Sequence, residues 1–268
     1  MKLKSTYLVK PNAKVKLSRV ATDDTGPFKH EEAAKAVLDQ HREKLAQLQE
    51  VFYASRQKAL LIVLQGMDTA GKDGVISHIF SGVNPQGCNV SSFKEPTPTE
   101  KLHDFLWRIH SQVPPRGMIQ IFNRSHYEDI LVPRVHRLIS AGKLDQHLED
   151  ILEFESMLHD NDVVVLKFFL HISYQEQTRR LQSRIDTPDK HWKLSESDFR
   201  EREFWPRYEE AYNRVLGATS RKYAPWFIIP SDYKWYRNAA ISEILVGAIK
   251  SLKLEYPKPS LDPSTIQL

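Results

Sequence analysis

A lysine and two aspartates lie within one glycine-rich segment, where they could act on phosphate groups. The residues from Gly66 to Lys72 match the pattern G-x-x-x-x-G-K. Glycines let the backbone turn tightly, so that several N–H groups and the N-terminus of a following helix face one anion, while Lys72 adds a cation. The alternative is a turn with a surface lysine. We interpret the segment as a phosphate-binding loop, with Lys72 and these further phosphate-binding positions: Gly66, Ala70, Gly71, Asp73 and Gly74.

Two acidic residues in this segment indicate a divalent cation. Asp68 lies inside the loop, and Asp73 stands where Ser or Thr usually holds magnesium. Two carboxylates beside a phosphate would repel it unless a cation lay between them. We therefore expect Mg²⁺ at Asp68 and Asp73. We also expect Lys72 in a solvated part of the loop, where its replacement leaves the fold intact.

A second group of polar residues follows an apolar segment further along the chain. In many P-loop enzymes an acid at the end of a neighbouring strand orients the metal, and here Asn123 occupies that place. Glu128 and Asp129, in the first turn of the next helix, would supply the missing negative charge. Arg124 and Glu128 are four residues apart, so the alternative for them is a surface ion pair on one helix.

Apolar segments of strand length precede both groups and alternate with helical patterns. We predict strands at 60–64, 88–94, 116–122, 162–172 and 225–230. We predict helices at 31–55, directly after the glycine-rich loop, at 99–112 with Thr99 as its cap, and at 234–252. This alternation predicts an α/β fold, a doubly wound, five-stranded parallel sheet flanked by helices, and the glycine-rich loop after its first strand makes the expected fold P-loop kinase-like. In such sheets ligands bind at the carboxyl ends of the strands, where both polar groups emerge.

The composition limits the classes of protein to which the chain can belong. With 268 residues and 31.1 kDa, the chain can bury one large core. A net charge of +4 and an isoelectric point near 9.0 suit a polyanionic partner. The one cysteine excludes a disulfide framework, and no apolar run reaches membrane-spanning length. The N-terminus lacks the apolar region of a signal peptide, so we expect a cytoplasmic protein with no membrane partner.

Three regions differ in composition. Residues 1–30 are predicted to form a basic arm, which is either extended along the surface or solvated as a tail. Residues 31–255 are predicted to form the phosphotransferase domain, and residues 256–268 a C-terminal tail. Within the domain, about 179–207 is rich in arginine and lysine around Pro188. We interpret this region as a helical lid that excludes water from a transferring group. The alternative is a solvated charged hairpin.

Four separated motifs resemble the second family of polyphosphate kinases: 66–74 (GMDTAGKDG), 122–128 (FNRSHYE), 190–195 (KHWKLS) and 224–226 (APW). Most members of that family carry Asp-Arg-Ser after the third strand. This chain has Asn123-Arg124-Ser125, which resembles the class-III branch, whose members phosphorylate both nucleoside mono- and diphosphates.

The resemblance implies a reversible transfer of the terminal phosphoryl group of inorganic polyphosphate to AMP and ADP, with Mg²⁺ or Mn²⁺. Adenine nucleotides are the expected acceptors, guanine nucleotides are a second option, and the chain is expected to form a homo-oligomer, a dimer or a tetramer. The implied catalytic residues are Asp68, Lys72, Arg124, Arg179 and Arg180. Arg184 would bind phosphate, the nucleotide would be bound by Asn123, Glu128, Arg134 and Lys193, and the metal by Asp68, Asp73 and Asp129.

Three other functions are compatible with parts of the sequence. An ATP-dependent nucleoside monophosphate kinase would also use a P-loop, and polyphosphate-dependent activity without ATP separates it from the first interpretation. A nucleotide-binding switch would lack steady turnover. A nucleic-acid-binding protein ranks last, because no reading helix or aromatic and basic stacking surface is present, so we expect no nucleic-acid partner.

Overall fold

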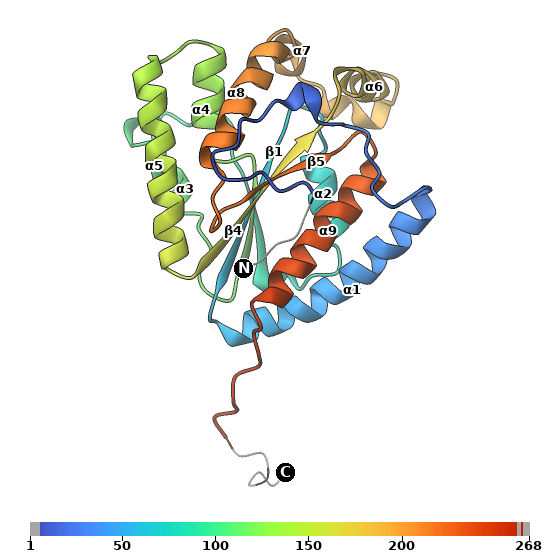
Figure 1. Cartoon of the computed structure of the whole chain (residues 1–268), viewed down its shortest axis with the longest axis vertical. Coiled ribbons are helices and arrows are strands. Elements are labelled where there is room, and N and C mark those ends of the chain that lie inside the picture. The colour runs from blue at the N-terminus through green and yellow to red at the C-terminus, as the bar shows by residue number, and fades with distance from the viewer. Residues whose placement is uncertain (1–5, 262–263, 265–268) are drawn as a thin grey trace.

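Five segments pair as one parallel sheet in the computed structural model, which describes residues 6–261 and 264 (Figure 1). The strands are β1 (Ala59–Gln65), β2 (Cys88–Ser92), β3 (Ile119–Asn123), β4 (Val163–His171) and β5 (Trp226–Pro230). Their order is β2-β3-β1-β4-β5, so β1 lies at the centre. The chain continues from β1 first to one side and later to the other, which makes the carboxyl end of β1 the switch point where such folds bind ligands.

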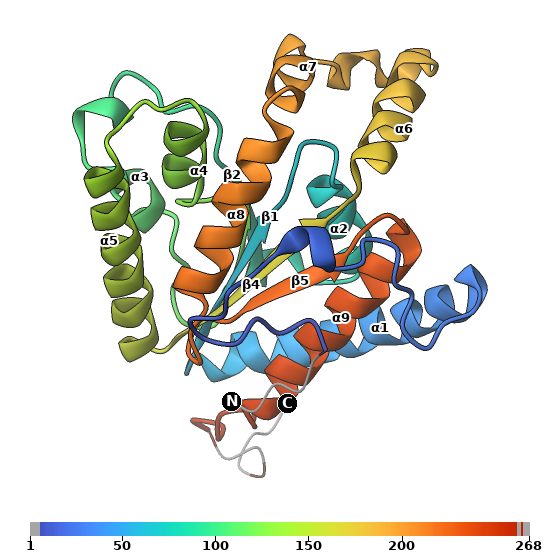
Figure 2. The same ribbon diagram turned by 45° about the horizontal axis from the view of Figure 1, so that its top comes forward.

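Helices cover both faces of the sheet, which confirms the doubly wound α/β prediction. One layer holds α1 (Glu31–Ser55), α2 (Lys72–Ile79) and α9 (Lys234–Ser251), and the other holds α4 (Glu128–Val135), α5 (Ala141–Asp160) and α8 (Trp205–Thr219) (Figures 1 and 2). The β1 side chains are all buried because both faces of this central strand are covered. Among the described residues, no helix is long and apolar enough to cross a bilayer.

A helical segment extends beyond the carboxyl ends of the strands. It consists of α6 (Tyr174–Ile185), η4 (Pro188–Lys193) and α7 (Glu196–Arg202), and Figure 2 shows α6 and α7 projecting above the sheet. The Ser173 hydroxyl accepts a 3.0 Å hydrogen bond from the Glu176 amide and caps α6. The segment is therefore helical, as expected for the region around 179–207.

The N-terminal segment packs against the edge of the sheet. Leu8 forms an antiparallel bridge with Phe227 of β5, and the Val9 amide donates a 2.9 Å hydrogen bond to the Trp226 carbonyl. Val9 and Leu17 are buried. Of the two alternatives for this arm, the structure shows the packed one for residues 6–30. Residues 1–5 of the predicted arm, and 262–263 and 265–268 of the predicted tail, lie outside the described residues.

Most predicted elements differ from the structure by one or two residues at an end, and the elements predicted at 99–112 and 116–122 differ most. Instead of a helix at 99–112 there are two short turns, η3 (Glu100–Leu102) and α3 (Trp107–His110). Thr99 occupies the N-cap position of the first turn, as predicted, but its side chain makes no capping hydrogen bond. Thr97 and Glu100 supply those bonds, since the Thr97 hydroxyl accepts from the Glu100 amide at 3.2 Å and the Glu100 carboxylate accepts from the Thr97 amide at 2.7 Å. The third strand begins at Ile119 and not at 116, because Gly117 adopts φ 90° in a turn.

No prediction covers α5 from the sequence, although its signal is present. Its buried residues recur at helical spacing, and Ser140 caps its first turn: Leu144, Leu148, Ile151, Phe154, Glu155 and Leu158. The buried Glu155 interrupts this apolar pattern. Similarly, the region assigned to the lid ends inside α8, which continues to Thr219 and belongs to the layer over the sheet.

Candidate active site

The glycine-rich loop connects the end of β1 to the start of α2, as predicted. Gly66 has a φ of 155°, and a Cβ atom there would lie 2.7 Å from the Leu170 carbonyl oxygen. Gly71 has a φ of 101°, and a Cβ atom there would overlap the Arg237 guanidinium group. Only glycine fits both positions, because the loop backbone lies directly against β4 and α9.

Lys72 is the first residue of α2 and is 8% exposed. Its Nζ donates a 2.8 Å hydrogen bond to the Gly66 carbonyl, so the ammonium group lies within the loop. Burial lowers the pKa of Lys72. The prediction of a solvated Lys72 is therefore wrong, because the end of β1 and the first turn of α2 enclose this side chain.

Two consecutive residues at the end of β3 hold the two acids of the loop. Asn123 Nδ2 donates a 2.7 Å hydrogen bond to Asp73 Oδ1, and Arg124 Nη2 lies 2.6 Å from Asp68 Oδ1. Arg124 has a φ of 63°, which turns the chain directly after the strand. The structure thus brings together four residues that the sequence places in two groups about fifty positions apart.

Glu128, at the start of α4, lies beside this polar cluster. Among the described residues Arg124 pairs with Asp68 and not with Glu128, because Arg124 precedes the helix and the i, i+4 geometry does not apply. Burial raises the pKa of Glu128, against the attraction of Arg124 and Lys72. Burial acts to lower the pKa of Arg124, but Glu128 and Asp68 outweigh it and raise that pKa. The guanidinium group therefore carries its charge between two acids.

A cavity of about 520 Å³ opens beside the loop, large enough for a nucleotide-sized ligand. One wall is polar and includes Asp68, Arg124 and Glu128. A second wall is apolar and includes Phe93, Val132, Pro133 and Leu138. The third wall comes from α7 and α8: Ser197, Glu201, Arg202, Trp205, Tyr208 and Tyr212. The projecting helical segment therefore takes part in the cavity.

Asp129 lines the same cavity but is engaged by an arginine. Arg108 Nη2 lies 3.1 Å from Asp129 Oδ2, and Arg108 Nη1 donates a 2.8 Å hydrogen bond to the Lys94 carbonyl. The same guanidinium group lies 5.7 Å from the centre of the Phe93 ring. Burial raises the pKa of Asp129, and Arg108 opposes this effect. Asp129 thus anchors a wall of the cavity.

The three acids predicted as metal ligands are not assembled in one cluster. Within residues 6–261 and 264, no three His, Cys, Asp or Glu side chains lie close enough together to hold a metal ion. Mg²⁺ in phosphotransferases usually takes one or two carboxylates together with waters and substrate phosphates. The carboxylates of Asp68 and Asp73, on either side of the phosphate-binding turn, fit that donor chemistry without Asp129.

The two adjacent arginines predicted as catalytic lie in different environments. Arg179 is 73% exposed on α6 and pairs with Glu176. Arg180 is buried, and its Nη1 donates 2.9 Å hydrogen bonds to the carbonyls of Thr69 and Ala70, while its Nε lies 2.6 Å from Glu176 Oε1. Arg180 therefore fixes the backbone of the glycine-rich loop, whereas Arg179 extends into solvent.

Three further predicted residues form contacts between or beside the helices and, like Lys72, Asp73 and Asn123, are not part of the lining of the 520 Å³ cavity. Arg184 pairs with Asp198 at 3.1 Å and links α6 to α7. Arg134 pairs with Glu210 at 2.8 Å and links α4 to α8. Lys193 is exposed, with its Nζ 4.9 Å from the centre of the Trp192 ring. Each of these cations is placed in or near the helices that border the cavity.

Arg237 and Gln177 contact the loop but belong to no predicted motif. Arg237 in α9 is 1% exposed, and its Nη1 donates a 3.1 Å hydrogen bond to the Ala70 carbonyl. Burial and the neighbouring Arg180 lower the pKa of Arg237 to about 9, so it is a buried cation at neutral pH. Gln177 Nε2 donates a 3.0 Å hydrogen bond to the Asp68 carbonyl. One signal in the sequence could have indicated that Arg237 is buried: it is a charged residue directly before a run of mostly small and apolar residues.

Comparisons with known proteins identify the family of the chain. A family model described as Polyphosphate kinase 2 (PPK2) matches residues 28–257 of the chain. The chain belongs to the polyphosphate kinase 2 family. The match includes the loop at Gly66, the end of β3 and the projecting helices, so the whole site of this PPK2 family member lies within it.

Two curated relatives are similar over nearly their full length. The AMP/ADP-polyphosphate phosphotransferase of Meiothermus ruber is 47% identical over 254 residues, which cover 94% of this chain and 95% of that protein. The ADP-polyphosphate phosphotransferase of Rhodopseudomonas palustris is 41% identical over 271 residues, which cover 96% of this chain and 94% of that protein. The crystal structure of polyphosphate kinase 2 from Arthrobacter aurescens TC1 superposes with a TM-score of 0.90 at 40% identity, covering 96% of this chain and 95% of that one. This PPK2 family member therefore shares the fold of a solved family member.

Proposed function

We propose that this protein transfers the terminal phosphoryl group of inorganic polyphosphate to AMP and to ADP, forming ADP and ATP in a reversible reaction. One observation carries the proposal: a single cavity joins the phosphate-binding loop at Gly66 and Asp68 to an apolar wall at Phe93 and Val132. A nucleotide needs this combination, because its phosphates require cations and its base requires an apolar surface. The relatives named as phosphotransferases of AMP and ADP support the same acceptors.

The acceptor nucleotide would occupy this cavity with its phosphate near Arg124. Arg124 is held by its ion pair with Asp68 and is attracted by the nearby Glu128, and its guanidinium group would meet the incoming phosphate there. Glu128 would help to place the nucleotide, as the class-III resemblance implies. Asn123 would act through Asp73, because its amide is already bonded to that carboxylate.

The phosphate that leaves polyphosphate would lie at the first turn of α2. Lys72, which lies within the loop, and the backbone amides of this first turn would neutralise the group during its transfer. An oxygen of the acceptor phosphate attacks the terminal phosphorus of polyphosphate, and the bond from that phosphorus to the bridging oxygen breaks. The shortened polyphosphate leaves with the electron pair. No side chain has to act as a nucleophile, so no covalent enzyme intermediate is needed.

A divalent cation would be held by Asp68 and Asp73. When bound, Mg²⁺ or Mn²⁺ would offset the negative charge of the two phosphate substrates. The chain itself orients these two carboxylates, because Asn123 and Arg124 hold them in place. The Mg²⁺ requirement itself stays a prediction.

The projecting segment from α6 to α7 would serve as a lid. Ser197, Glu201 and Arg202 of α7 already line the cavity, so a small movement of this segment would change access to it. Arg179 and Arg184, which lie on α6, would contact the phosphates when the lid is closed. Closure would exclude water, which otherwise competes as a phosphoryl acceptor.

A coupled assay tests the proposal. Purified protein is incubated with Mg²⁺, long-chain polyphosphate and AMP, with no ATP added, and the nucleotides are followed by chromatography. We expect ADP first and ATP later. ADP alone would restrict the acceptor to AMP. Activity that requires ATP as donor would instead support a nucleoside monophosphate kinase, and the absence of any turnover would favour a nucleotide-binding switch.

Several features implied by the composition or the family resemblance stay predictions. These are assembly into a dimer or tetramer, a cytoplasmic location, acceptance of guanine nucleotides, and the division of the chain into an arm, a domain and a tail. The same assay with GMP tests the base preference, and light scattering tests the assembly.

A further inference from the structure

A lysine lies in the middle of the buried strand β4. Lys167 pairs with Val63 of β1 on one side and with Trp226 of β5 on the other, and its side chain is 0% exposed. Strands in the centre of a covered parallel sheet are normally apolar. A buried ammonium group is tolerated only where other groups satisfy its charge and its three hydrogens.

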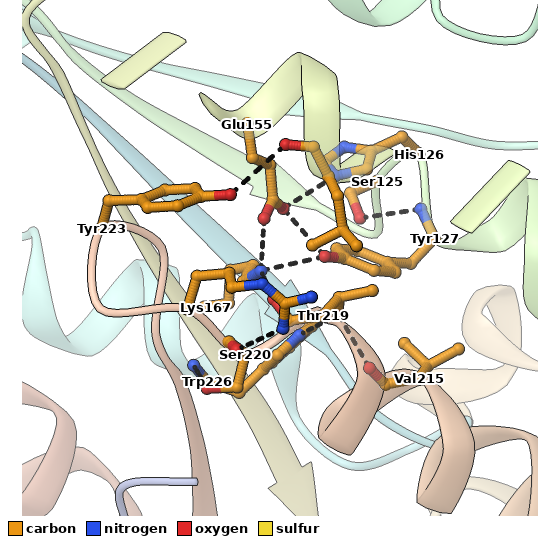
Figure 3. A network of polar contacts seen from close by, with 12 residues as sticks. Ser125, His126, Tyr127, Glu155, Lys167, Val215, Thr219, Ser220, Tyr223 and Trp226 are labelled. Atoms are coloured by element: carbon orange, nitrogen blue, oxygen red, sulfur yellow. Dashed lines mark hydrogen bonds and ion pairs between the residues drawn. The ribbon is translucent and has the colours of Figure 1, made fainter. Parts of the chain in front are cut away.

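All three hydrogens of this ammonium group have partners, as Figure 3 shows. Lys167 Nζ lies 2.5 Å from Glu155 Oε2 of α5, and it donates 2.9 Å hydrogen bonds to the Tyr127 hydroxyl and to the Thr219 carbonyl of α8. Burial lowers the pKa of Lys167 to about 8, and Glu155 opposes this effect. Burial acts to raise the pKa of Glu155, but Lys167 and His126 outweigh it and lower that pKa. Both groups are therefore charged at neutral pH.

The acid of this pair binds the chain segment that follows β3. The Tyr127 hydroxyl donates a 2.8 Å hydrogen bond to Glu155 Oε1, and His126 Nε2 lies 3.3 Å from the same oxygen. His126 and Tyr127 are 0% exposed and stand directly between Arg124 and Glu128 in the chain. The ion pair thus holds the middle of the segment whose two ends contribute to the active site.

This segment needs such a support because its first turn is strained. Arg124 adopts a φ of 63°, a conformation that a residue with a side chain keeps only when its surroundings enforce it. The side chain of Arg124 reaches Asp68 of the loop, and Glu128 begins α4. A rotation of the segment would move both away from the positions that the proposed transfer requires.

We propose that the buried Glu155–Lys167 pair is a positioning device for phosphoryl transfer, which acts through Tyr127 to hold Arg124 and Glu128 toward the cavity. The inference rests on the proposed function. The pair does not touch the substrate, so Glu155, Lys167 and Tyr127 are positioning residues. A buried ion pair is a weak source of stability, since apolar replacements of both partners are often tolerated, and this makes a role in positioning separable from one in folding.

The test compares two tyrosines that border α5. Tyr127→Phe removes the hydroxyl that bridges Lys167 and Glu155. Tyr223→Phe is the matched control, because the Tyr223 hydroxyl donates a 3.5 Å hydrogen bond to the Leu152 carbonyl of the same helix and makes no hydrogen bond to the described residues 124–128. We expect Tyr127→Phe to lower kcat about 10- to 100-fold, with the KM for polyphosphate changed by less than about two-fold. We expect Tyr223→Phe to match the native protein.

A second pair of variants separates positioning from stability. The double variant Glu155→Leu with Lys167→Met removes both charges together, and we expect its melting temperature to stay near or above that of the native protein while kcat falls as in Tyr127→Phe. Glu155→Gln keeps an acceptor for Tyr127, and we expect it to retain more activity than the double variant. If the double variant fails to fold, Tyr127→Phe and Glu155→Gln still decide the question.

The outcomes distinguish the two proposals. If the native protein shows no polyphosphate-dependent transfer, the proposed function is wrong. If the native protein is active and Tyr127→Phe keeps the kcat of Tyr223→Phe, the positioning role is wrong. A loss of kcat that merely follows a loss of folded protein, measured by circular dichroism at the assay temperature, would also overturn it.

Discussion

Asn123 Nδ2 donates a 2.7 Å hydrogen bond to Oδ1 of Asp73, the residue that takes the usual place of a magnesium-binding hydroxyl. The acid after the P-loop lysine is therefore held by an amide at the end of the neighbouring strand, and not by a second acid. An amide can hold a carboxylate without metal, whereas two carboxylates at this distance would repel each other. The contact explains how the loop keeps its shape before substrates arrive.

Replacing this amide by a carboxylate should make the site depend on metal. Without metal, we expect Asn123→Asp to be less stable by about 1 kcal/mol, because a hydrogen bond becomes a repulsion. Saturating Mg²⁺ should restore the stability, and the ratio of AMP to ADP phosphorylation should change. Thermal melts with EDTA and with Mg²⁺ measure the first effect. The exposed Asn89→Asp in β2 is the control, and equal metal responses of the two variants would remove Asn123 from the metal site.

The burial of Lys72 predicts that its replacement lowers the rate of catalysis but not the stability of the fold. Lys72→Met should lower kcat by about 10²–10³, as expected for the loss of a preorganised charge. The melting temperature should not fall, because burial already disfavours the ammonium group, as its lowered pKa indicates. Steady-state kinetics and melting curves are compared with those of the exposed Lys250→Met. A well-folded Lys72→Met protein with near-native turnover would refute the assignment of the P-loop.

The raised pKa of Glu128 predicts that Glu128→Gln is more thermally stable than the native protein, by an amount that depends on pH. A carboxyl group whose pKa is higher in the folded protein stabilises the fold while protonated, below the ordinary value of 4.5. That contribution is lost as the pH rises through the folded-state pKa. Glu128→Gln should therefore melt higher than the native protein at pH 7.5, by about 2–4 °C for a gain of about 1 kcal/mol, and the difference should shrink toward pH 4.5. Glu149→Gln, on the exposed face of α5, should show neither effect.

Variants of Arg179 and Arg180 should separate an effect on catalysis from an effect on the structure of the glycine-rich loop. Arg180→Met should destabilise the protein by about 3–5 kcal/mol, because the buried Glu176 loses its buried partner and keeps only the exposed Arg179, and because the loop carbonyls lose their donor. Arg179→Met should change stability by less than about 0.5 kcal/mol, because its side chain is 73% exposed. If Arg179 contacts phosphate in the closed lid, kcat of this variant falls although its melting curve is native. Native kinetics of Arg179→Met would exclude that contact.

The buried charge of Arg237 should favour binding of the polyanionic donor. We expect Arg237→Met to raise the KM for polyphosphate about 10-fold, because the loop loses a cation behind Ala70 and Gly71. Arg237→Lys should lie between the Arg237→Met variant and the native protein. Initial rates at varied polyphosphate concentration give the KM values, with Arg42→Met on α1 as the control. A change in the KM for AMP but not for polyphosphate would assign Arg237 to the acceptor side.

Local patterns in the sequence predicted the strands, their parallel arrangement and the phosphate-binding loop. Apolar runs, glycine spacing and the lysine at position 72 depend on residues close together in the chain, and their physical requirements hold in any protein. The same patterns placed Asn123 and Asp73 at the same edge of the sheet, but not in contact. The four motifs were sufficient to indicate the family.

Only the tertiary structure decided which charged side chains contact each other and which are buried. Whether Arg180 grips the loop or reaches solvent depends on which face of α6 packs inward, and adjacent arginines have the same local sequence signal. Arg237 and the Lys167–Glu155 pair acquire their partners from elements far away in the chain, so no spacing rule reveals them. Lys72 is buried because β1 and α2 enclose it, although its residue type suggested exposure. Long-range packing set the environment of each charge, and the environment sets its chemistry.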